Sequence, residues 1–256
     1  MGGQVPEGWP VVVHVSRPAE IAGVLDAVSV GRGRPVVVLV GGAGGMDDDA
    51  VRKLEEVLRR AVLPVIDACR ATVIDGGTDS GVMRAVGRAR SEAGTSFPLV
   101  GVAARGTVAL PETSSATGAA GIDMHHTHLL LVPGTEWGDE APWIVDVADA
   151  VAGDRPSVTL LVNGGEIAYD DADRSLDRGR PVVVLAGTGR TADAIADAAA
   201  GRSGDARGRR IARSGLTRIV PIDDLAALQT ALVNALRVAD CQPVATDQHL
   251  DEGEVR

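Results

Sequence analysis

Arg190 is the side chain whose type and position point most clearly to chemistry. It comes directly after the turn Gly187, Thr188 and Gly189, which follows a β-branched run and precedes a helix-forming stretch. Backbone N–H groups at the start of a helix attract anions, and a guanidinium adds charged, fork-shaped hydrogen bonds. We therefore expect this turn to bind an anion, and phosphate is the commonest candidate.

Three further glycine turns follow predicted strands in the same way: GGAGG, DGGTDSG and NGGE. In DGGTDSG, the glycines permit close backbone approach, and the hydroxyls either cap a helix or bind phosphate. GGAGG has neither the spacing of a dinucleotide-binding fingerprint nor the lysine of a P-loop. The candidate ligand contacts in these turns are Gly41, Gly42, Gly76, Gly77, Thr78, Ser80, Gly81, Gly164 and Gly165.

A histidine cluster and a run of carboxylates are the other candidate groups. In an extended segment His126 and His128 point to one face, a spacing that is compatible with a metal site. The alternative, which we favour, is that His125, His126 and His128 satisfy backbone groups or one another at a strand entrance, with no metal. In EWGDE most carboxylates are expected to cap a helix or to be solvated, and Glu140 could bind a ribose hydroxyl.

The sequence marks no catalytic group. It contains no Gly-x-Ser-x-Gly nucleophile elbow and no carboxylate pair whose setting indicates an acid–base couple. A hydrolase of N-glycosidic bonds would have to use Glu140 or Asp75 to activate water. The catalytic residues, if there are any, stay unknown from the sequence.

Composition excludes several classes of protein. The formal net charge of −10 argues against a nucleic-acid partner, and the aromatic content of 2% argues against stacking of bases on several rings. The sequence has no apolar stretch as long as a membrane span and no signal-peptide pattern, so we expect a cytoplasmic protein. The two cysteines, Cys69 and Cys241, lie far apart in helical patterns, and we expect both to be reduced thiols.

Strand and helix patterns alternate along the chain. The predicted strands span residues 11–15, 36–40, 71–74, 98–103, 128–132, 158–162, 179–185 and 218–222. The predicted helices span 19–28, 47–69, 141–152, 166–176 and 191–200, with two more ending near 93 and 239. This alternation predicts an α/β fold, a Rossmann-like, doubly wound and mostly parallel sheet with helices on both faces.

The glycine turns should meet at one edge of that sheet, because the ligands of doubly wound sheets bind beyond the carboxyl ends of the strands. The segment GRPVVVL occurs twice, at residues 33–39 and 179–185, and each copy leads into glycines. Two copies make sense if both face one ligand with more than one phosphate. An internal duplication kept only for packing would look the same.

We expect a single domain over residues 1–245 and an acidic, disordered tail over 246–256. The polar segment 105–123 is predicted to be a loop, and segment 201–215 is basic and rich in glycine. A loop as long as 105–123 is usually functional or mobile.

Six segments occur in the order found in one known family: DGGTDSGVMRAVG, VGVAARG, IDMHHTHLLLV, EWGDE, NGGE and GRPVVVLAGTGRTADAIAD. Over residues 36–236 the chain resembles the TRPM-like (LSDAT) prokaryotic group of SLOG domains, which is related to the N-terminal cytoplasmic region of TRPM channels and more distantly to LOG proteins. Two segments match the ligand loops of the family, at residues 76–81 and 187–190. The segment AARG stands where the family has APWG, and the LOG signature P-G-G-x-G-T-x-x-E is absent.

The resemblance implies a nucleotide-binding domain, with an NAD-derived diphosphate such as ADP-ribose or its cyclic forms as ligand and a role in signalling, stress or antiphage response. Three readings compete. A non-catalytic ligand sensor comes first, an N-glycosidic-bond hydrolase acting on nucleotides second, and a structural or interaction domain third. We expect a small-molecule nucleotide partner, no required cofactor, and a homo-oligomer or an effector protein as a further option.

Overall fold

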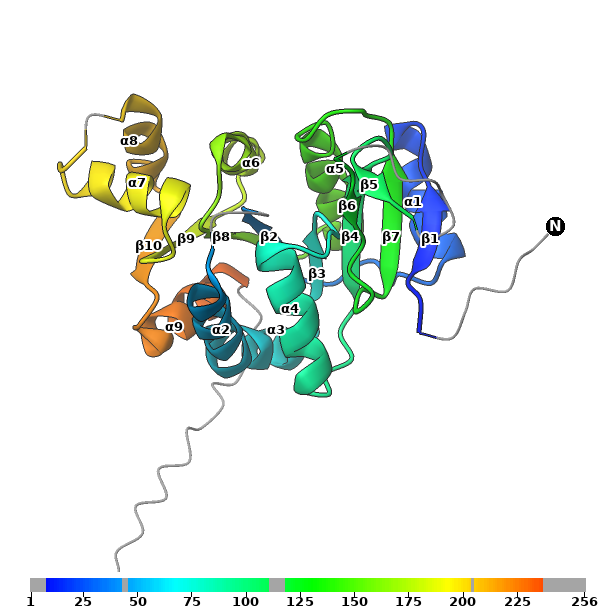
Figure 1. Cartoon of the computed structure of the whole chain (residues 1–256), viewed down its shortest axis with the longest axis horizontal. Helices are drawn as coiled ribbons and strands as arrows, with labels where there is room; N and C mark the ends of the chain where they lie inside the picture. The colour runs from blue at the N-terminus through cyan, green and yellow to red at the C-terminus, as the bar shows by residue number, and fades with distance from the viewer. Residues whose placement is uncertain (1–7, 43–45, 111–117, 204, 237–256) are drawn as a thin grey trace, which may run out of the picture.

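The computed structural model describes residues 8–42, 46–110, 118–203 and 205–236 (Figure 1). In this part of the chain, eight parallel strands form one sheet in the order β1-β7-β4-β3-β2-β8-β9-β10. The strands are β1 (Val11–His14), β2 (Val36–Gly41), β3 (Thr72–Asp75), β4 (Leu99–Ala104), β7 (His128–Val132), β8 (Ser157–Val162), β9 (Val182–Ala186) and β10 (Thr217–Pro221).

Helices cover both faces of the sheet. One face packs against α2 (Asp48–Val57), α3 (Leu63–Cys69), α4 (Gly81–Glu92) and α9 (Leu225–Leu236). The other packs against α1 (Ile21–Ala27), α5 (Ala141–Ala152), α6 (Glu166–Asp177), α7 (Arg190–Ala199) and α8 (Ala206–Ala212). The prediction of a Rossmann-like, doubly wound α/β fold is therefore confirmed.

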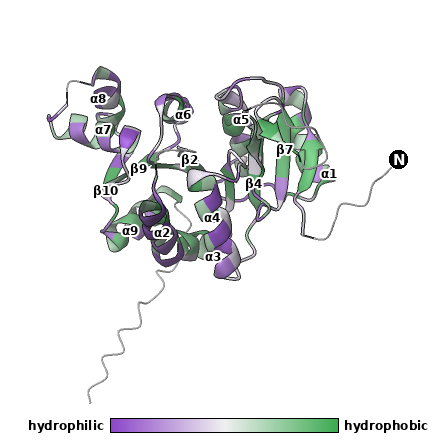
Figure 2. Cartoon of the chain, in the orientation of Figure 1, coloured by the Kyte–Doolittle hydropathy of each residue, from purple (hydrophilic) through white to green (hydrophobic). Residues whose placement is uncertain are grey.

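Aliphatic strand residues supply the core. Val36 to Val40 are all buried because β2 lies near the middle of the sheet and is covered on both faces, as its unbroken β-branched run predicts. Alternate residues of β2 join opposite cores: Val37 and Leu39 belong to the first, and Val36, Val38 and Val40 to the second. Figure 2 shows hydrophobic colour on strands such as β4 and β7 and hydrophilic colour on parts of α2 and α4.

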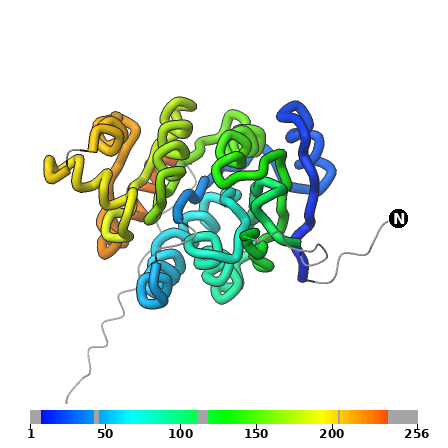
Figure 3. Tube along the Cα trace, turned by 45° about the horizontal axis from the view of Figure 1, so that its top comes forward, coloured from blue at the N-terminus to red at the C-terminus, as the bar shows by residue number. Residues whose placement is uncertain are grey.

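The winding of the chain reverses between β2 and β8. From β2 the strand order continues through β3 and β4 to the edge at β1, and from β8 it continues through β9 to the other edge at β10. Figure 3 shows the first described segment at one end of the molecule and the segment from α7 to α9 at the other. The helices that follow β2 and β8, which are α2 and α6, lie on opposite faces. A crevice at the carboxyl edge is the geometric result. The two GRPVVVL copies supply β2 and β9, one on each side of β8.

The helix predicted over 47–69 is interrupted. Between α2 and α3 the chain makes a π-helical turn, Leu58–Val62, directly before Pro64. Pro64 has no N–H to donate to the carbonyl of Arg60, and the wider turn accommodates its ring. Gln229 of α9 donates its side-chain amide to that carbonyl at 3.1 Å, so the interruption is also a contact between helices.

Two segments contain more structure than predicted. The predicted loop 105–123 carries two short paired strands, β5 (Val108–Ala109) and β6 (Ala120–Gly121). The basic segment 201–215 contains α8, because Asp205 caps a short helix whose Ile211 is buried.

The proposed tail 246–256 lies outside the described residues, and the single-domain assignment stays a prediction. Within the described ranges no helix has both the length and the apolar character to cross a membrane.

Cys69 corrects one expectation. It is buried at the end of α3 and disulfide-bonded, so the prediction of a reduced thiol at this position is wrong. Helix α3 packs against α9, the helix that leads toward the end of the chain, a proximity that sequence distance does not reveal. The other cysteine, Cys241, lies outside the described residues.

Gly77 shows why the turn after β3 needs its glycines. Its φ is +68°, and a Cβ built on it would lie 2.6 Å from Leu129 Cδ1 and 2.9 Å from Gly101 Cα. The turn therefore rests directly on the backbone of β4. The absent side chain of Gly77 points into the protein, toward β4 and β7.

We expect Gly77→Ala to destabilise the fold by about 2–5 kcal/mol, from about 1–2 kcal/mol for the left-handed backbone and about 1–3 kcal/mol for overpacking. Gly94→Ala is the matched control, because Gly94 has a similar φ of +65° and open space at its Cβ position. Urea unfolding measures both. A Gly77→Ala variant that loses no more than the Gly94→Ala control would contradict the close approach.

Candidate functional site

A cavity of about 420 Å³ lies in the crevice between β2 and β8. The ends of β2, β3 and β4, the segment before α5, and the first turns of α6 and α7 all contribute to its walls. This is the expected ligand position in a doubly wound sheet. Its volume is within the range of about 300–1,000 Å³ that small-molecule sites occupy.

Half of the candidate ligand contacts line this cavity, and they come from every predicted turn. The predicted residues that line it are Gly41, Gly42, Gly76, Thr78, Glu140, Gly165 and Arg190. The predicted residues outside its lining are Gly77, Ser80, Gly81, Gly164, Gly187, Thr188 and Gly189. The turns thus meet at one edge, as expected, but only some residues of each turn line the cavity.

The AGTGR turn uses its backbone donors internally. The N–H groups of Gly187 and Gly189 donate to the two oxygens of Asp193, at 2.6 and 3.1 Å. Thr188 is buried, and its hydroxyl donates to the Leu185 carbonyl and accepts from the Asn163 N–H. Two N–H groups of the turn are therefore bound by Asp193 of the same helix, one turn into α7, and the ligand contacts predicted for Gly187, Thr188 and Gly189 stay predictions.

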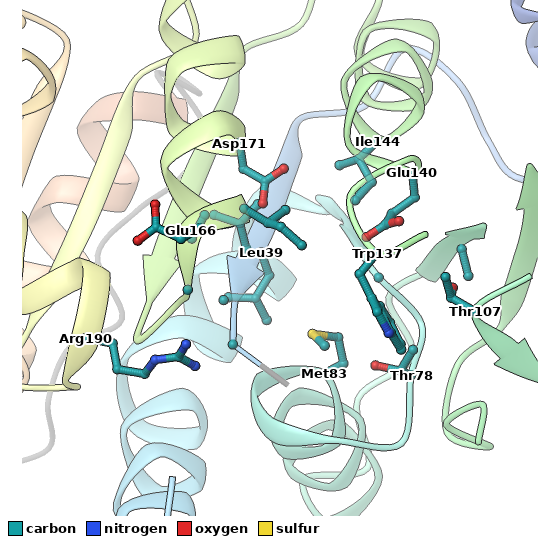
Figure 4. A pocket seen from close by; sticks show the side chains of 18 residues that line it. Leu39, Thr78, Met83, Thr107, Trp137, Glu140, Ile144, Glu166, Asp171 and Arg190 are labelled. Carbon is teal, nitrogen blue, oxygen red and sulfur yellow. The ribbon is translucent and has the colours of Figure 1, made fainter. Parts of the chain in front are cut away.

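The side chain of Arg190 is the part of this turn that lines the cavity. Its backbone is left-handed, with a φ of +49°, and its side chain extends into the cavity (Figure 4). The guanidinium lies over Gly165, where a Cβ would come within 2.9 Å of Nη2. Gly165 therefore has no side chain at the place where the arginine needs room. Both residues belong to turns that the sequence marked, but their contact joins α6 to α7.

The DGGTDSG turn presents Gly76 and Thr78 to the cavity. The Thr78 hydroxyl lies 3.1 Å from that of Ser80, the N-cap residue of α4, whose side chain forms no capping hydrogen bond. Gly41 at the end of β2 packs on the same helix, because a Cβ there would lie 2.7 Å from Val82 Cγ2. The cavity floor is thus backbone from β2 and β3 set against the start of α4.

A buried network of charged side chains contacts this turn on the side away from the cavity. His126 is 4% exposed, and its Nε2 and Nδ1 lie 2.7 Å from Asp75 Oδ1 and 2.8 Å from Asp123 Oδ2. Asp75 Oδ1 also accepts the Gly77 N–H at 2.7 Å. Since both ring nitrogens face carboxylate oxygens, both must carry protons, and the ring is cationic. Burial alone lowers the pKa of His126, but the charge of Asp75 and the hydrogen bonds to Asp123 and Asp75 outweigh it and raise the pKa to about 9.

The other two histidines have carboxylate and backbone partners. His125 Nδ1 lies 2.8 Å from Asp123 Oδ1, and His128 Nε2 lies 2.9 Å from the Val28 carbonyl. Asp75 does not line the cavity and is fully buried beside His126, so it is not placed to activate water there. The favoured interpretation of the cluster as a set of satisfied histidines agrees with these contacts. That it holds no essential metal stays a prediction.

Three carboxylates face the cavity, and sequence reasoning found only one of them. Glu140, at the start of α5, is joined by Glu166 and Asp171 of α6. Burial raises the pKa of Glu140, whose Oε2 accepts the Gly138 N–H at 3.0 Å. Burial and then the charges of Glu140 and Asp170 raise the pKa of Asp171 to about 7. In the EWGDE segment Asp139 accepts the N–H groups of Thr135 and Glu136 and so holds the turn that precedes α5.

Trp137 is the third residue of the cavity lining that the sequence analysis missed, after Glu166 and Asp171. It is 45% exposed and lines the cavity opposite Arg190 (Figure 4). A signal was present, since an indole beside charged residues in a chain with three tryptophans is unusual. For Asp171 the signal was its spacing along the predicted helix. It lies three residues after Ala168 and four after Ile167, so all three share one helix face, and all three line the cavity.

We expect the stability of the protein to fall between pH 6 and pH 10 because of His126. Its folded pKa of about 9 is raised above the ordinary value of 6.5, so the stabilisation is complete below pH 6.5 and is lost as the pH rises through 9. The loss should be at most roughly 3 kcal/mol. Urea unfolding of the wild type and of His126→Gln across this range measures it, and an NMR titration of the imidazole gives the pKa directly.

His14→Gln is the control, because His14 is exposed at the edge strand β1. It should keep the wild-type pH dependence, whereas His126→Gln should lose it. An imidazole that titrates near its ordinary value in the folded protein would rule out the cationic network.

Comparisons with known proteins agree with the fold and with the site's position in it. A family model described as SLOG in TRPM, prokaryote, matches residues 34–231, a range that includes every residue lining the cavity. The transient receptor potential cation channel subfamily M member 2 of Mus musculus is 26% identical over 183 residues, which are 57% of this chain and 12% of the channel. The same channel of Rattus norvegicus is 26% identical over 184 residues, 58% of this chain and 12% of the channel. The chain thus spans about an eighth of the length of these relatives, and it belongs to the SLOG family of the TRPM-like prokaryotic type.

Proposed function

We propose that this SLOG domain is a non-catalytic sensor that binds a nucleotide in the cavity between β2 and β8. The observation that carries the proposal is the joint placement of Arg190, the glycine turns and the exposed Trp137 around one cavity. An NAD-derived diphosphate such as ADP-ribose or a cyclic form is the ligand class we favour. A role in signalling or in stress or antiphage response is part of the same proposal.

The glycines and Arg190 suit phosphate. Gly76 lines the cavity, and a Cβ there would meet only Met83, at 3.9 Å, so its backbone is open to close approach, while the guanidinium beside Gly165 supplies the positive charge. Because the backbone donors of the AGTGR turn are held by Asp193, the side chain of Arg190 has to supply the contact.

Trp137 suits the base. A flat, amphipathic ring that is exposed at the cavity mouth offers a stacking surface to any nucleobase. Figure 4 shows Trp137 and Arg190 on opposite sides of the cavity, the arrangement that a molecule with a base at one end and phosphate at the other would need.

Hydrolysis of an N-glycosidic bond is the second candidate, because Glu140 lines the cavity and burial raises its pKa. In that reaction water adds to C1′ of the ribose, the base leaves with a proton, and a carboxyl group would transfer the protons. Chromatography after incubation with NAD or AMP decides this point. Released nicotinamide or adenine identifies a hydrolase, and intact nucleotide with measured binding identifies a sensor.

The remaining expectations belong to this proposal. No cofactor is required besides the nucleotide, the domain works in the cytoplasm, and a second copy of the chain or an effector protein receives the signal. None of these steps bears on the cavity geometry, so the binding experiments below do not depend on them.

Arg190→Ala should weaken nucleotide binding about 10- to 150-fold, because one charge-assisted contact is worth about 1.5–3 kcal/mol. Calorimetry with ADP-ribose, ADP and AMP measures the effect, and circular dichroism checks the fold. Arg218→Ala is the control, since Arg218 is exposed on β10 and does not line the cavity. Equal affinities for wild type and Arg190→Ala, or no binding of any nucleotide by the wild type, would refute the proposal.

Gly165→Ala should reduce affinity without a large loss of stability. The added methyl group meets only the flexible end of Arg190, at 2.9 Å, so it displaces the guanidinium and leaves the backbone unstrained. We expect about a 3- to 10-fold weaker binding of ADP and a change in unfolding free energy below about 1 kcal/mol. In an Arg190→Ala background the same substitution should have no further effect on affinity, and an additive effect would contradict this mechanism.

A further inference from the structure

The cavity is electrically asymmetric. Arg190 of α7 stands at one side with Glu166 of α6 above it, and Glu140 before α5 and Asp171 of α6 form a second set of carboxyl groups farther from Arg190 (Figure 4). A polyphosphate that filled the whole cavity would place a second anion against these carboxyl groups. The carboxyl side therefore requires a part of the ligand that donates hydrogen bonds and carries no negative charge.

Asp171 is placed differently from its neighbours on α6. Asp170 pairs with Arg207, and Asp173 pairs with Arg207 and Arg210, on the side of the helix that faces α8. Asp171 lines the cavity and forms no hydrogen bond or ion pair with any residue in the described ranges. Its oxygens are thus acceptors that the fold itself does not use.

Glu140 offers a second acceptor beside Trp137. Its Oε2 accepts the Gly138 N–H, and its Oε1 forms no hydrogen bond within the described part of the chain. Glu140 and Trp137 come from the same segment before α5, so a base stacked on Trp137 would bring its own sugar to Glu140. Asp171 lies between that point and Arg190 in Figure 4.

We propose that Glu140 and Asp171 accept hydrogen bonds from the 2′- and 3′-hydroxyls of a ribose and exclude a phosphate group at either position. The ligand then lies with its base on Trp137, its ribose on the carboxyl pair and its 5′-phosphates at Arg190. This assignment rests on the proposed nucleotide-binding function and makes it specific for ribonucleotides with free hydroxyls.

Two matched pairs of probes test the assignment by calorimetry: ADP against 2′-deoxyADP, and AMP against adenosine 2′,5′-bisphosphate. In the wild type the first member of each pair should bind at least about tenfold more tightly, because the second lacks a charge-assisted hydrogen bond or adds a repelled anion. Asp171→Asn keeps the size of the side chain and removes the charge. It should reduce both ratios to about threefold or less.

Asp177→Asn is the control for the loss of one charge on α6, since Asp177 is exposed at the end of the helix and does not line the cavity. It should keep the wild-type ratios. Equal binding of ADP and 2′-deoxyADP, or ratios that Asp171→Asn leaves unchanged, overturns the carboxyl assignment, while a retained effect of Arg190→Ala keeps the proposed function. If no probe binds the wild type, both proposals fail.

Discussion

The reversal of winding between β2 and β8 is the constraint on which the site depends. Parallel strands send their connections from the same edge, and α2 and α6 leave that edge toward opposite faces. No helix can then cover the ends of both strands, so a cavity remains at the centre of a sheet whose inner strands are otherwise buried. The side chains that fill its rim come from α5, α6 and α7, which are far apart in the sequence.

Keeping that cavity open requires precise support for the backbone beneath it, and the support differs on the two sides. On the β3 side the turn is held by Gly77 against β4 and by the ionic contact of Asp75 with His126. A buried imidazolium between two carboxylates is expensive to desolvate, and it is tolerated because each ring N–H has an acceptor. On the β8 side the support is neutral, through Thr188 and Asn163. The two sides should therefore respond differently to pH.

The sequence predicted the sheet, the meeting of the glycine turns and the place of Arg190, because each follows from local patterns: β-branched runs, glycines after strands, and the rule that parallel strands end at one edge. It did not predict Asp171 or the partners of His126. Whether Asp171 faces a cavity depends on the rotation of α6 against the sheet, and Asp75 meets His126 only because β3 and β7 both adjoin β4. The disulfide at Cys69 was also missed, since the spacing of cysteines in a sequence does not show which of them meet in the fold.

The AGTGR turn shows that N–H groups of a glycine turn can be bound by a carboxylate of the helix that follows it. Gly187 and Gly189 do direct their N–H groups at an anion, but the anion is Asp193, which the chain supplies four residues after the turn. The contacts of Asp193 with Gly187 and Gly189 hold the turn directly before Arg190, whose backbone is left-handed. The guanidinium of Arg190 is then the group that this turn offers to the cavity, in place of backbone N–H donors. A methyl group on Gly165 would displace it. The position of the guanidinium at this edge therefore depends on the contact between Gly165, before α6, and Arg190, at the start of α7, and not on either glycine motif alone.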